Sequence, residues 1–500
     1  MPNPDTPRPP PSPLQHTVPE VSDMAAADRP PYGVSQRPRR RRRRLVVTGV
    51  VVAAVVVAAG GVTAYETGRL ADWLGDGDAA PVADTVPGYT APAAPTPGVV
   101  ARPARVGAGD AAAVRSALAE PLEDSDLFDL RAVVAPLSGP ALLDVGHGTS
   151  MPASTLKLLT TTAALETLGP DHTFATRVVA GPRHGIVLVG GGDPFLEGAR
   201  PPTGVAHDDA SLQALAFKTA RQLGANGTRS VRLSYDDSLF TGPRVNPHWP
   251  ATYIPDDVVS PITALWADEG RNPSGYGRVA DPPATAAAIF ATYLRQDGVR
   301  VAPAVGQATA RAGAPELARV TSPPLADIVE RILLVSDNEG AEVLARQVGL
   351  AVDGEGSFAG GVSGVRTTLT RLGIDLDGAT IEDGSGLSRD DRVAAETLVD
   401  VLQLASSPAH ADLRSVISGL PVAAYDGSLG DRFDDSPGRG YVRAKTGTLH
   451  GTSALAGLST DARGRVLVFA FVSNHVNGAD TLDTRAALDR LASALATCRC

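Results

Sequence analysis

A hydroxyl and an amine lie three residues apart in the segment Met151-Pro-Ala-Ser-Thr-Leu-Lys157, at the start of an apolar run. On a helix this spacing puts Ser154 and Lys157 on one face, so the amine can reach the hydroxyl. A serine hydroxyl becomes a nucleophile when a neighbouring base removes its proton. A buried lysine beside another cation can be that base, because both effects lower the pKa of its amine. The pair therefore predicts covalent catalysis through Ser154.

Lysine is rare in this chain, which has 42 Arg and three Lys, at positions 157, 218 and 445. Arginine stays protonated in a protein, whereas a desolvated lysine can lose its proton and act as a base. Two of the three lysines lie in short motifs that arginine could not replace chemically. This usage indicates that Lys157 and Lys445 were kept for their chemistry.

Two further motifs supply groups that an acyl-transfer site needs. Lys445 begins Lys-Thr-Gly-Thr, in which the amine and the hydroxyls of Thr446 and Thr448 can bind a carboxylate. The other motif is Ser-Asp-Asn, in which Ser336 can relay a proton to a leaving amine and Asn338 can hold a substrate amide. Together with Ser154 and Lys157, these groups predict acyl transfer to water with carboxylate recognition.

Each motif also has a structural interpretation when it is taken alone. A serine three residues before a lysine usually marks a solvated helix face. Ser336-Asp-Asn338 is as typical of a helix cap as of an active site. The order of the three motifs, and the elements expected to carry them, favour the catalytic interpretation.

Helices are predicted around the first two motifs. The apolar run after Ser154 ends at Gly169-Pro170 and predicts a buried helix. Apolar residues at helical spacing predict another helix up to Val335, and a further one from about Glu339. The Ser-Asp-Asn motif therefore lies on a turn between helices.

Strands are predicted around the third motif. Residues 441–449, 452–459 and 465–473 read as three antiparallel strands, and residues 480–497 as a closing amphipathic helix. The motif lies on the first strand, where Gly447 offers no side chain to block a ligand that lies along it. Antiparallel strands with flanking helices indicate a mixed α/β (α+β) fold.

The interval between the first two motifs predicts an inserted domain. It spans 179 residues, from Lys157 to Ser336, and its middle has helix and strand patterns of its own. We expect a smaller domain at residues 181–315, which splits the catalytic domain into residues 106–180 and 316–500.

The N-terminal residues predict export and a membrane anchor. Residues 1–44 form a Pro-rich, disordered tail that ends in a run of arginines, and residues 45–65 carry no charge over a length sufficient for a transmembrane helix. The positive flank places the tail in the cytoplasm, so the chain is a single-pass membrane protein with its catalytic part outside. Residues 66–105 form a Pro- and Ala-rich linker. The alternative is secretion after cleavage of a signal peptide near Ala64.

Composition excludes several other functions. After position 44 there are 36 basic and 51 acidic residues, and this net charge of −15 argues against binding to nucleic acid. No motif with metal-ligand spacing and no phosphate loop is present, so we expect neither a metal nor a cofactor. The two cysteines, Cys498 and Cys500, are too close together to staple a domain.

The three motifs in this order resemble those of the penicillin-binding and serine β-lactamase superfamily. The segments that begin at Pro152, at Gly191 (Gly-Gly-Asp-Pro) and at Asp383 (Asp-Gly-Ser-Gly-Leu-Ser-Arg) are similar to the D-alanyl-D-alanine carboxypeptidase/endopeptidase family, the low-molecular-mass class C penicillin-binding proteins. The resemblance runs from about Val106 to Ala496. It implies a transpeptidase-type catalytic domain, with an antiparallel sheet flanked by helices.

The resemblance also implies roles for individual residues. Ser154 would be the nucleophile, Lys157 the base and the backbone N–H groups of Ser154 and Thr448 the oxyanion hole. Arg389 and Asp237 would reach the pocket for the substrate's side-chain end. From the residues alone, Arg389 can equally pair with Asp383 or Asp390, and Asp237 can cap a turn. The remaining residues with an implied role are those of the second and third motifs: Ser336, Asn338, Lys445, Thr446 and Thr448.

The function that this resemblance implies is a serine D-Ala-D-Ala carboxypeptidase that acts on peptidoglycan stem peptides and is acylated by β-lactams. Whether it also cuts peptide cross-links as an endopeptidase is left open. Two alternatives remain: a β-lactamase or esterase on the same scaffold, which needs fast deacylation, and a penicillin-binding sensor or scaffold without turnover.

Overall fold

The computed structural model describes residues 108–183, 185–199, 210–303 and 305–500. The predicted tail, residues 1–44, the predicted membrane helix, residues 45–65, and the linker, residues 66–105, lie outside this part of the chain. Among the described residues, no helix combines the length and the apolar composition needed to cross a membrane.

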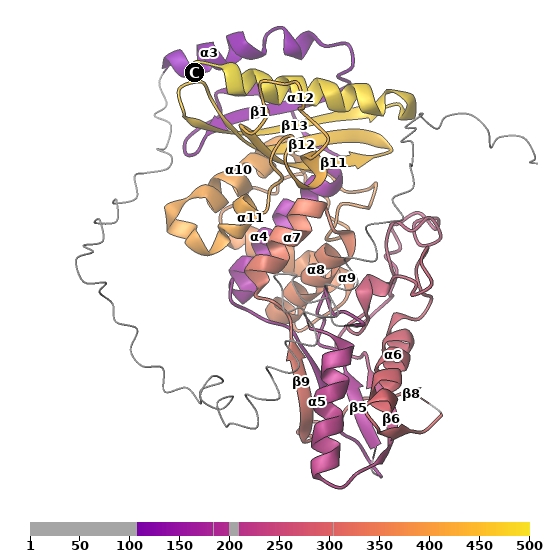
Figure 1. Cartoon of the computed structure of the whole chain (residues 1–500). Coiled ribbons are helices and arrows are strands. Elements are labelled where there is room, and N and C mark those ends of the chain that lie inside the picture. The colour runs from indigo at the N-terminus through magenta and orange to yellow at the C-terminus, as the bar shows by residue number, and fades with distance from the viewer. Residues whose placement is uncertain (1–107, 184, 200–209, 304) are drawn as a thin grey trace, which may run out of the picture. The chain divides into compact units, whose positions relative to one another are not determined.

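A five-stranded antiparallel sheet with the order β11-β12-β13-β1-β2 forms the centre of the larger part of the structure (Figure 1). Leu130 near the start of the described chain lies opposite Ser473 near its end, so one sheet joins both halves of the sequence. The three strands that the sequence predicted around the third motif are confirmed as β11, β12 and β13, the last three strands along the chain. The strands are β1 (Leu130–Pro136), β2 (Leu143–Val145), β11 (Val442–Leu449), β12 (Gly451–Thr460) and β13 (Val466–Val476).

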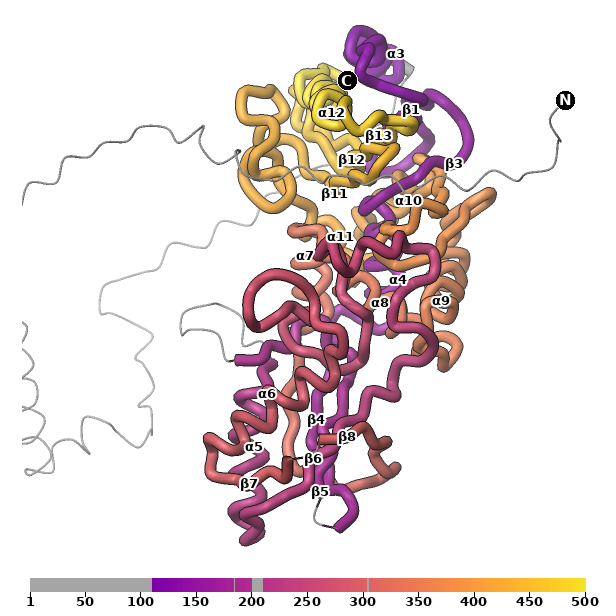
Figure 2. The backbone as a smooth tube through the Cα atoms, turned by 90° about the vertical axis from the view of Figure 1, so that its right-hand side faces the viewer, coloured from indigo at the N-terminus to yellow at the C-terminus, as the bar shows by residue number. Residues whose placement is uncertain are grey.

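Both faces of this sheet are covered by helices, as the alternation along β13 requires. Phe469 and Phe471 pack with α3 (Ala108–Leu118) and α12 (Thr481–Thr497), which lie side by side in Figures 1 and 2. Ala470 and its even-numbered neighbours pack against the opposite layer. That layer comprises α4 (Lys157–Leu168), α7 (Leu325–Val335), α8 (Asn338–Asp353), α9 (Phe358–Arg371), α10 (Ala395–Ser406) and α11 (Ser415–Ser418).

A second sheet has the order β7-β6-β5-β4-β9, with β8 paired to β6. Helices α5 (Leu212–Ala225) and α6 (Pro282–Gln296) cover one of its faces around Phe290. Short strands β3 (Thr149–Ser150) and β10 (Val393–Ala394) pair separately, near the first sheet. The strands of the second sheet are β4 (Ala175–Ala180), β5 (Gly185–Val189), β6 (Ser230–Asp236), β7 (Arg300–Val301), β8 (Gly306–Gln307) and β9 (Glu316–Thr321).

The second sheet extends past both predicted edges of the inserted segment, residues 181–315. Its strands β4 and β9 pair with each other from Ala175 to Thr321, so they belong to the same sheet as the strands of the inserted segment. The division of the chain into a catalytic and an inserted domain stays a prediction.

Helices α8 and α9 lie unusually close because glycines line their contact. A Cβ atom on Gly349 would lie 2.5 Å from the backbone of Glu355 and of Gly360. A Cβ atom on Gly364 would lie 3.1 Å from Gly349 itself. A methyl group at this contact therefore forces the two backbones apart.

We expect Gly349→Ala to lower the free energy of unfolding by about 1–3 kcal/mol, because overpacking costs more than the gain in helix propensity. Urea unfolding measures the change. The matched control is Gly224→Ala in α5, where a Cβ atom has no neighbour within 4 Å. The control should gain up to about 1 kcal/mol. Equal effects at the two positions would contradict the close-contact explanation.

Candidate active site

Ser154 lies in a 3-10 turn, η2 (Ala153–Leu156), that leads directly into α4 at Lys157. The sequence predicts Ser154 at the N-terminus of this helix, and the structure makes that first turn 3-10 rather than α-helical. Ala153 has a φ of +46°, outside the right-handed helical region, so regular helix does not continue before it. The tighter turn still brings the two side chains together, with 2.9 Å between Lys157 Nζ and Ser154 Oγ.

The amine of Lys157 is fully buried and has three hydrogen-bond partners. Besides Ser154 Oγ, it donates to Asn338 Oδ1 at 2.8 Å and to the carbonyl oxygen of Ser385 at 2.7 Å. An ammonium group has three donors, so these contacts satisfy it completely. The amide orientation of Asn338 is set by its Nδ2, which donates to the carbonyl oxygen of Val258 at 3.2 Å.

This arrangement determines where a neutral amine would direct its lone pair. The Ser385 carbonyl and the oriented Asn338 Oδ1 can only accept hydrogen bonds, whereas the Ser154 hydroxyl can also donate. When Lys157 loses a proton, its lone pair must therefore face Ser154 Oγ. The geometry converts a deprotonated Lys157 into a base for one particular hydroxyl.

Burial lowers the pKa of Lys157 to about 8, while the carboxylates of Asp383 and Glu342 act in the opposite direction. From the sequence, burial and the charge of Lys445 are both expected to lower this pKa. Burial, and then the charge of Lys157, also lower the pKa of Lys445 well below its usual value. Two buried amines this close disfavour each other's charged form.

Lys445 is also fully buried, and its amine donates to Ser336 Oγ at 2.8 Å and to the carbonyl oxygen of Thr446 at 2.9 Å. The hydroxyl of Thr446 in turn donates to Ser428 Oγ at 2.8 Å. Each lysine thus contacts one member of the Ser-Asp-Asn motif, Lys445 at Ser336 and Lys157 at Asn338. The structure brings the three motifs into one site.

The turn between α7 and α8 presents Ser336 and Asn338 to the lysines. Ser336 ends α7 in the left-handed conformation, with a φ of +64°. Asp337 then begins α8, because its carboxylate accepts a hydrogen bond from the N–H of Gly340 at 2.8 Å. The helix-cap interpretation of this motif therefore holds for Asp337, while its two neighbours face the lysines.

Glycine is required at position 447 because β11 runs against the serine turn. A Cβ atom there would lie 2.8 Å from the carbonyl oxygen of Pro152 and 3.3 Å from Ala153 Cβ. From the sequence, this glycine is explained by room for a ligand. In the structure it also allows the strand to approach the turn that carries Ser154.

The outer edge of β11 is suited to an extended substrate. β11 is the edge strand of its sheet, and the N–H of Ala444 donates to the carbonyl oxygen of Pro421, on the side away from β12. Backbone groups two residues apart on a strand point the same way, so those of Thr446 and Thr448 lie along this same edge. A peptide could pair with the edge as an added strand.

The Asp-Gly-Ser-Gly segment supports the site from behind. The carboxylate of Asp383 accepts hydrogen bonds from the N–H groups of Ser385 and Gly386 and from Trp249 Nε1. A Cβ atom on Gly386 would lie 1.9 Å from the carbonyl oxygen of Ala153, so this segment packs directly on the serine turn. It thereby fixes the Ser385 carbonyl that accepts from Lys157.

Glu342 holds the same segment from α8. Its buried carboxylate accepts hydrogen bonds from the N–H groups of Gly384 and Ser385, at 3.1 and 2.8 Å. Burial raises the pKa of Glu342 to about 8, with Asp383 contributing in the same direction. Glu342 was missed in the sequence, although it lies four residues after Asn338 and so on the same helix face. Ser428 was missed too, and no local pattern distinguishes it.

The structure does not join Asp237 or Arg389 to these residues. Asp237 is buried and accepts hydrogen bonds from the N–H groups of Ala264 and Leu265 and from Arg244 Nη2, at 2.8 Å for the last. Burial raises the pKa of Asp237 to about 6. The side chain of Arg389 is exposed and has no hydrogen bond or ion pair among the described residues.

Neither acid suggested as a partner of Arg389 is paired with it. Asp383 binds backbone N–H groups, and Asp390 lies 3.1 Å from His248 Nδ1. A separate group, Asp144, His147 and Glu396, is close enough together to hold a cation, but it includes none of the residues around Ser154.

Comparison with known proteins defines the class. Penicillin binding protein 4 of Haemophilus influenzae superposes on this chain with a TM-score of 0.61 at 22% sequence identity, covering 76% of this chain and 97% of that chain. The fold is therefore the penicillin-binding, serine β-lactamase-like fold. At the level of sequence, residues 114–276 and 272–495 match the D-Ala-D-Ala carboxypeptidase 3 (S13) family.

The chain belongs to this family of D-Ala-D-Ala carboxypeptidases, as the resemblance of its motifs predicted. A carboxypeptidase of Mycobacterium tuberculosis is 38% identical over 405 residues, which cover 78% of this chain and 85% of that protein. The carboxypeptidase DacB of Mycolicibacterium smegmatis is 37% identical and covers 84% and 91% of the two chains. A D-alanyl-D-alanine carboxypeptidase of Actinomadura is 30% identical, with coverage of 72% and 82%.

The two charges that act on Lys157 lead to a prediction on pH dependence. The rate of D-alanine release should rise with pH through the pKa of Lys157, about 8, because only the neutral amine can accept the proton of Ser154. Because the pKa of Glu342 is itself about 8, its carboxylate becomes charged over the same pH range, and that charge favours the ammonium form of Lys157. Glu342→Gln removes the charge, so the midpoint should move to lower pH by less than about one unit. Release of D-alanine from a soluble pentapeptide, followed from pH 6 to 10, measures the shift.

The control for this shift is Glu355→Gln, which removes an exposed carboxylate beyond the end of α8. Its midpoint should match that of the unchanged protein. A Glu342→Gln midpoint that stays in place, or moves to higher pH, would contradict the proposed electrostatic effect.

Proposed function

We propose that Ser154 is the nucleophile and Lys157 the base of a serine-type D-Ala-D-Ala carboxypeptidase that acts on peptidoglycan stem peptides. The observation that carries this proposal is the amine of Lys157, held between Ser154, Asn338 and the Ser385 carbonyl. Membership of the D-Ala-D-Ala carboxypeptidase family supplies the substrate.

In the acylation step, Ser154 Oγ attacks the carbonyl carbon between the two D-alanines and its proton passes to Lys157 Nζ. The backbone N–H groups of Ser154 and Thr448 stabilise the negative oxygen that forms. The C–N bond then breaks, and the proton that Lys157 accepted passes through Ser336, whose hydroxyl is held by Lys445, to the leaving amine. Lys157 is neutral again after this transfer. Free D-alanine leaves, and the rest of the peptide stays as an ester on Ser154.

In the deacylation step, water replaces the departed D-alanine. Lys157 accepts a proton from that water as its oxygen attacks the ester carbonyl, and Ser154 Oγ regains a proton as the ester bond breaks.

Before acylation, the terminal carboxylate of the substrate binds Lys445 with the hydroxyls of Thr446 and Thr448. Ser428, which contacts Thr446, orients that hydroxyl.

β-Lactams are covalent inhibitors in this proposal, because the strained amide presents a carbonyl and a carboxylate in the places that the site provides. A second structure of penicillin binding protein 4 of Haemophilus influenzae, solved in complex with a β-lactam, superposes with a TM-score of 0.55. A long-lived penicillin adduct separates this function from that of a β-lactamase. Turnover of a pentapeptide separates it from a sensor.

Replacing the nucleophile tests this proposal. Ser154→Ala should reduce D-alanine release from a pentapeptide by at least about 10⁴-fold, and it should abolish labelling by a fluorescent penicillin. Mass analysis of the products, with a cross-linked muropeptide in the same assay, also reports any endopeptidase action. The control is Ser459→Ala, which removes a buried hydroxyl without a hydrogen-bond partner among the described residues. Full labelling of Ser154→Ala would disprove the assignment.

We also propose that residues 45–65 anchor the protein in the membrane, with residues 1–44 in the cytoplasm. The support is the uncharged run of 21 residues that follows a block of arginines. The full chain should remain with membranes after alkaline carbonate extraction, and a chain that begins at residue 66 should be released. A mature protein that begins near residue 65 would show cleavage instead.

A further inference from the structure

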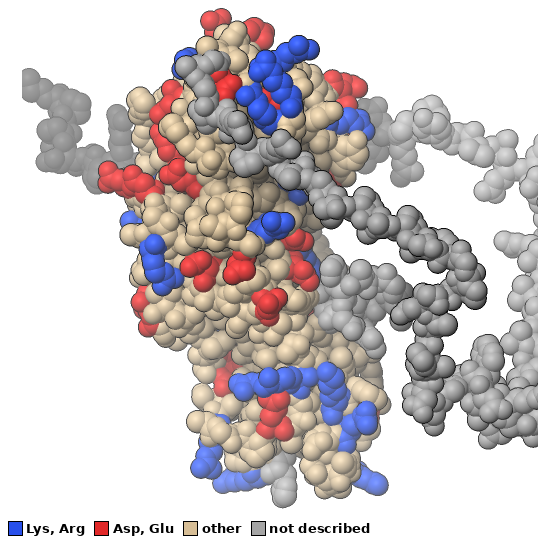
Figure 3. All heavy atoms as spheres, turned by 90° about the vertical axis from the view of Figure 1, so that its left-hand side faces the viewer, with Lys and Arg blue, Asp and Glu red and all other residues tan. Residues whose placement is uncertain are grey.

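Basic residues gather on the second sheet of a protein that is acidic as a whole. Residues 175–189, 212–236 and 295–321 contain ten Lys and Arg against three Asp and Glu, while the whole chain has a net charge of −10. Figure 3 shows a band of blue side chains with few red ones across the lower end of the molecule, where this sheet and α5 lie, besides other blue groups higher up. These elements therefore carry a net positive charge of their own.

The three acids of these elements do not neutralise the basic residues. Glu316 is bound by Arg319, with 2.7 Å between Oε2 and Nη2. Asp236 is buried, and its carboxylate accepts hydrogen bonds from the N–H groups of Ser238 and Ala310. Asp297 is exposed beyond the end of α6. Most of the positive charge is left for an external partner.

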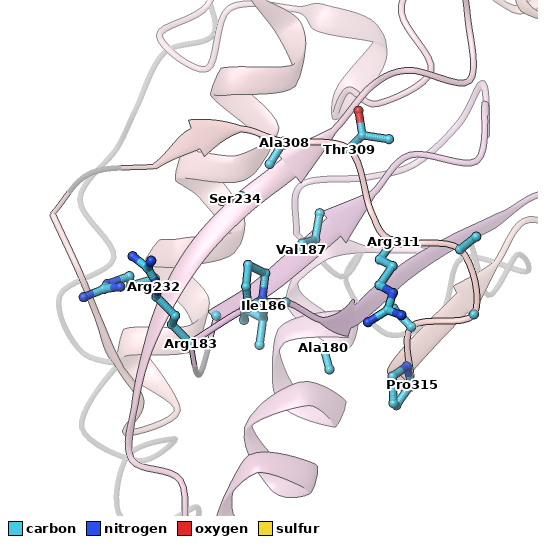
Figure 4. Close-up of a pocket in the computed structure, with 16 residues that line it drawn as sticks. Ala180, Arg183, Ile186, Val187, Arg232, Ser234, Ala308, Thr309, Arg311 and Pro315 are labelled. Atoms are coloured by element: carbon cyan, nitrogen blue, oxygen red, sulfur yellow. The ribbon is translucent and has the colours of Figure 1, made fainter.

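Three of these arginines line a pocket of about 960 Å³ on the sheet face opposite α5 and α6. Arg183 comes from the turn between β4 and β5, Arg232 from β6 and Arg311 from the segment before β9. In Figure 4, Arg183 and Arg232 lie at one end of the pocket and Arg311 at the other, with Ile186 and Val187 between them. No ion pair of these three arginines is found among the described residues.

The wall that carries Arg311 is held in place by backbone contacts. The N–H of Ala308 donates to the carbonyl oxygen of Tyr235 at 2.8 Å, and the N–H of Ala180 donates to that of Pro315 at 2.8 Å. Ala310 and Ala314 from this segment pack on Val187 and its neighbours. The pocket is thus a built feature of the sheet, within the size range of ligand sites.

The lining defines the chemistry of the occupant. Guanidinium groups bind carboxylates through paired hydrogen bonds, and two arginine ends match a molecule with separated carboxylates. The middle of the pocket is lined by valine and alanine side chains, which suit small apolar groups. A short acidic peptide with alanine-sized side chains has both properties.

We propose that this pocket binds a stem peptide of polymeric peptidoglycan through its carboxylates, as a second attachment point remote from Ser154. The proposal rests on the proposed function, which makes such peptides the substrate of the catalytic site. The pocket shares no residue with the site around Ser154, and Figure 1 shows β5 and β6 at the opposite end of the molecule from β11. A soluble pentapeptide cannot use both sites at once, whereas a polymeric wall can.

The test uses the full-length protein and insoluble peptidoglycan from which attached phosphate-containing polymers have been removed. The variant carries Arg183→Gln, Arg232→Gln and Arg311→Gln. We expect its co-sedimentation with this peptidoglycan to weaken roughly tenfold or more, because several charged hydrogen bonds are lost. D-Alanine release from the polymer should fall in parallel, and release from the soluble pentapeptide should stay unchanged.

The matched control carries Arg221→Gln, Arg229→Gln and Arg295→Gln, which remove the same charge from exposed positions outside the pocket. It should bind the polymer nearly as well as the unchanged protein. Amidation of the peptidoglycan carboxylates should abolish the difference between the unchanged protein and the pocket variant.

Four results would overturn the proposal: unchanged binding by the pocket variant, equal loss in the control, binding that requires the phosphate-containing polymers, or binding of the amidated polymer as before. Binding to anionic lipid vesicles that is lost in the pocket variant would show that the pocket binds a membrane surface, and this result would also overturn the proposal. Failure of the proposed function would be recognised separately, because then neither the unchanged protein nor either variant would release D-alanine from the pentapeptide.

Discussion

The amine of Lys157 is the interaction on which the site depends. Two of its three partners can only accept hydrogen bonds, so a change of protonation affects one contact, the one to Ser154. Each of the other contacts comes from a different part of the chain, one from the start of α8 and one from the segment that follows Asp383. The close packing of these segments therefore serves to direct one lone pair.

Electrostatics around this amine are a balance between burial and nearby acids. Burial favours the neutral form, while Asp383 and Glu342 favour the ammonium form, and the resulting pKa of about 8 lies near neutral pH. A base works best when its pKa is close to the working pH, because it must both accept and release a proton. Burial and the charge of Lys157 also lower the pKa of the neighbouring Lys445, while Asp383 and Glu342 act against burial at Lys157.

Sequence was sufficient for those features that depend on short-range order. The predicted closing helix, residues 480–497, and the strands of the third motif match α12 and β11 to β13, because apolar periodicity reports burial directly. The meeting of Ser154, Lys157, Asn338 and Lys445 was predictable from motif chemistry. The 3-10 turn at Ser154 was not, because it accompanies a left-handed Ala153 and close packing on Gly386, which a single sequence does not show. Glu342 and Ser428 depend on which segments meet in space, and such tertiary contacts leave little trace in a single sequence.

The sheet that holds β11 has a consequence for when the enzyme can become active. β1 pairs with β13, and β11 reaches β1 only through β12 and β13. A chain that is synthesised from its N-terminus carries Ser154 early, yet the strand with Lys445 has no sheet to join until residues up to Val476 are complete. The site can therefore assemble only after β11 to β13 have been synthesised. A nascent chain, or a chain truncated before these strands, would not hydrolyse the substrate.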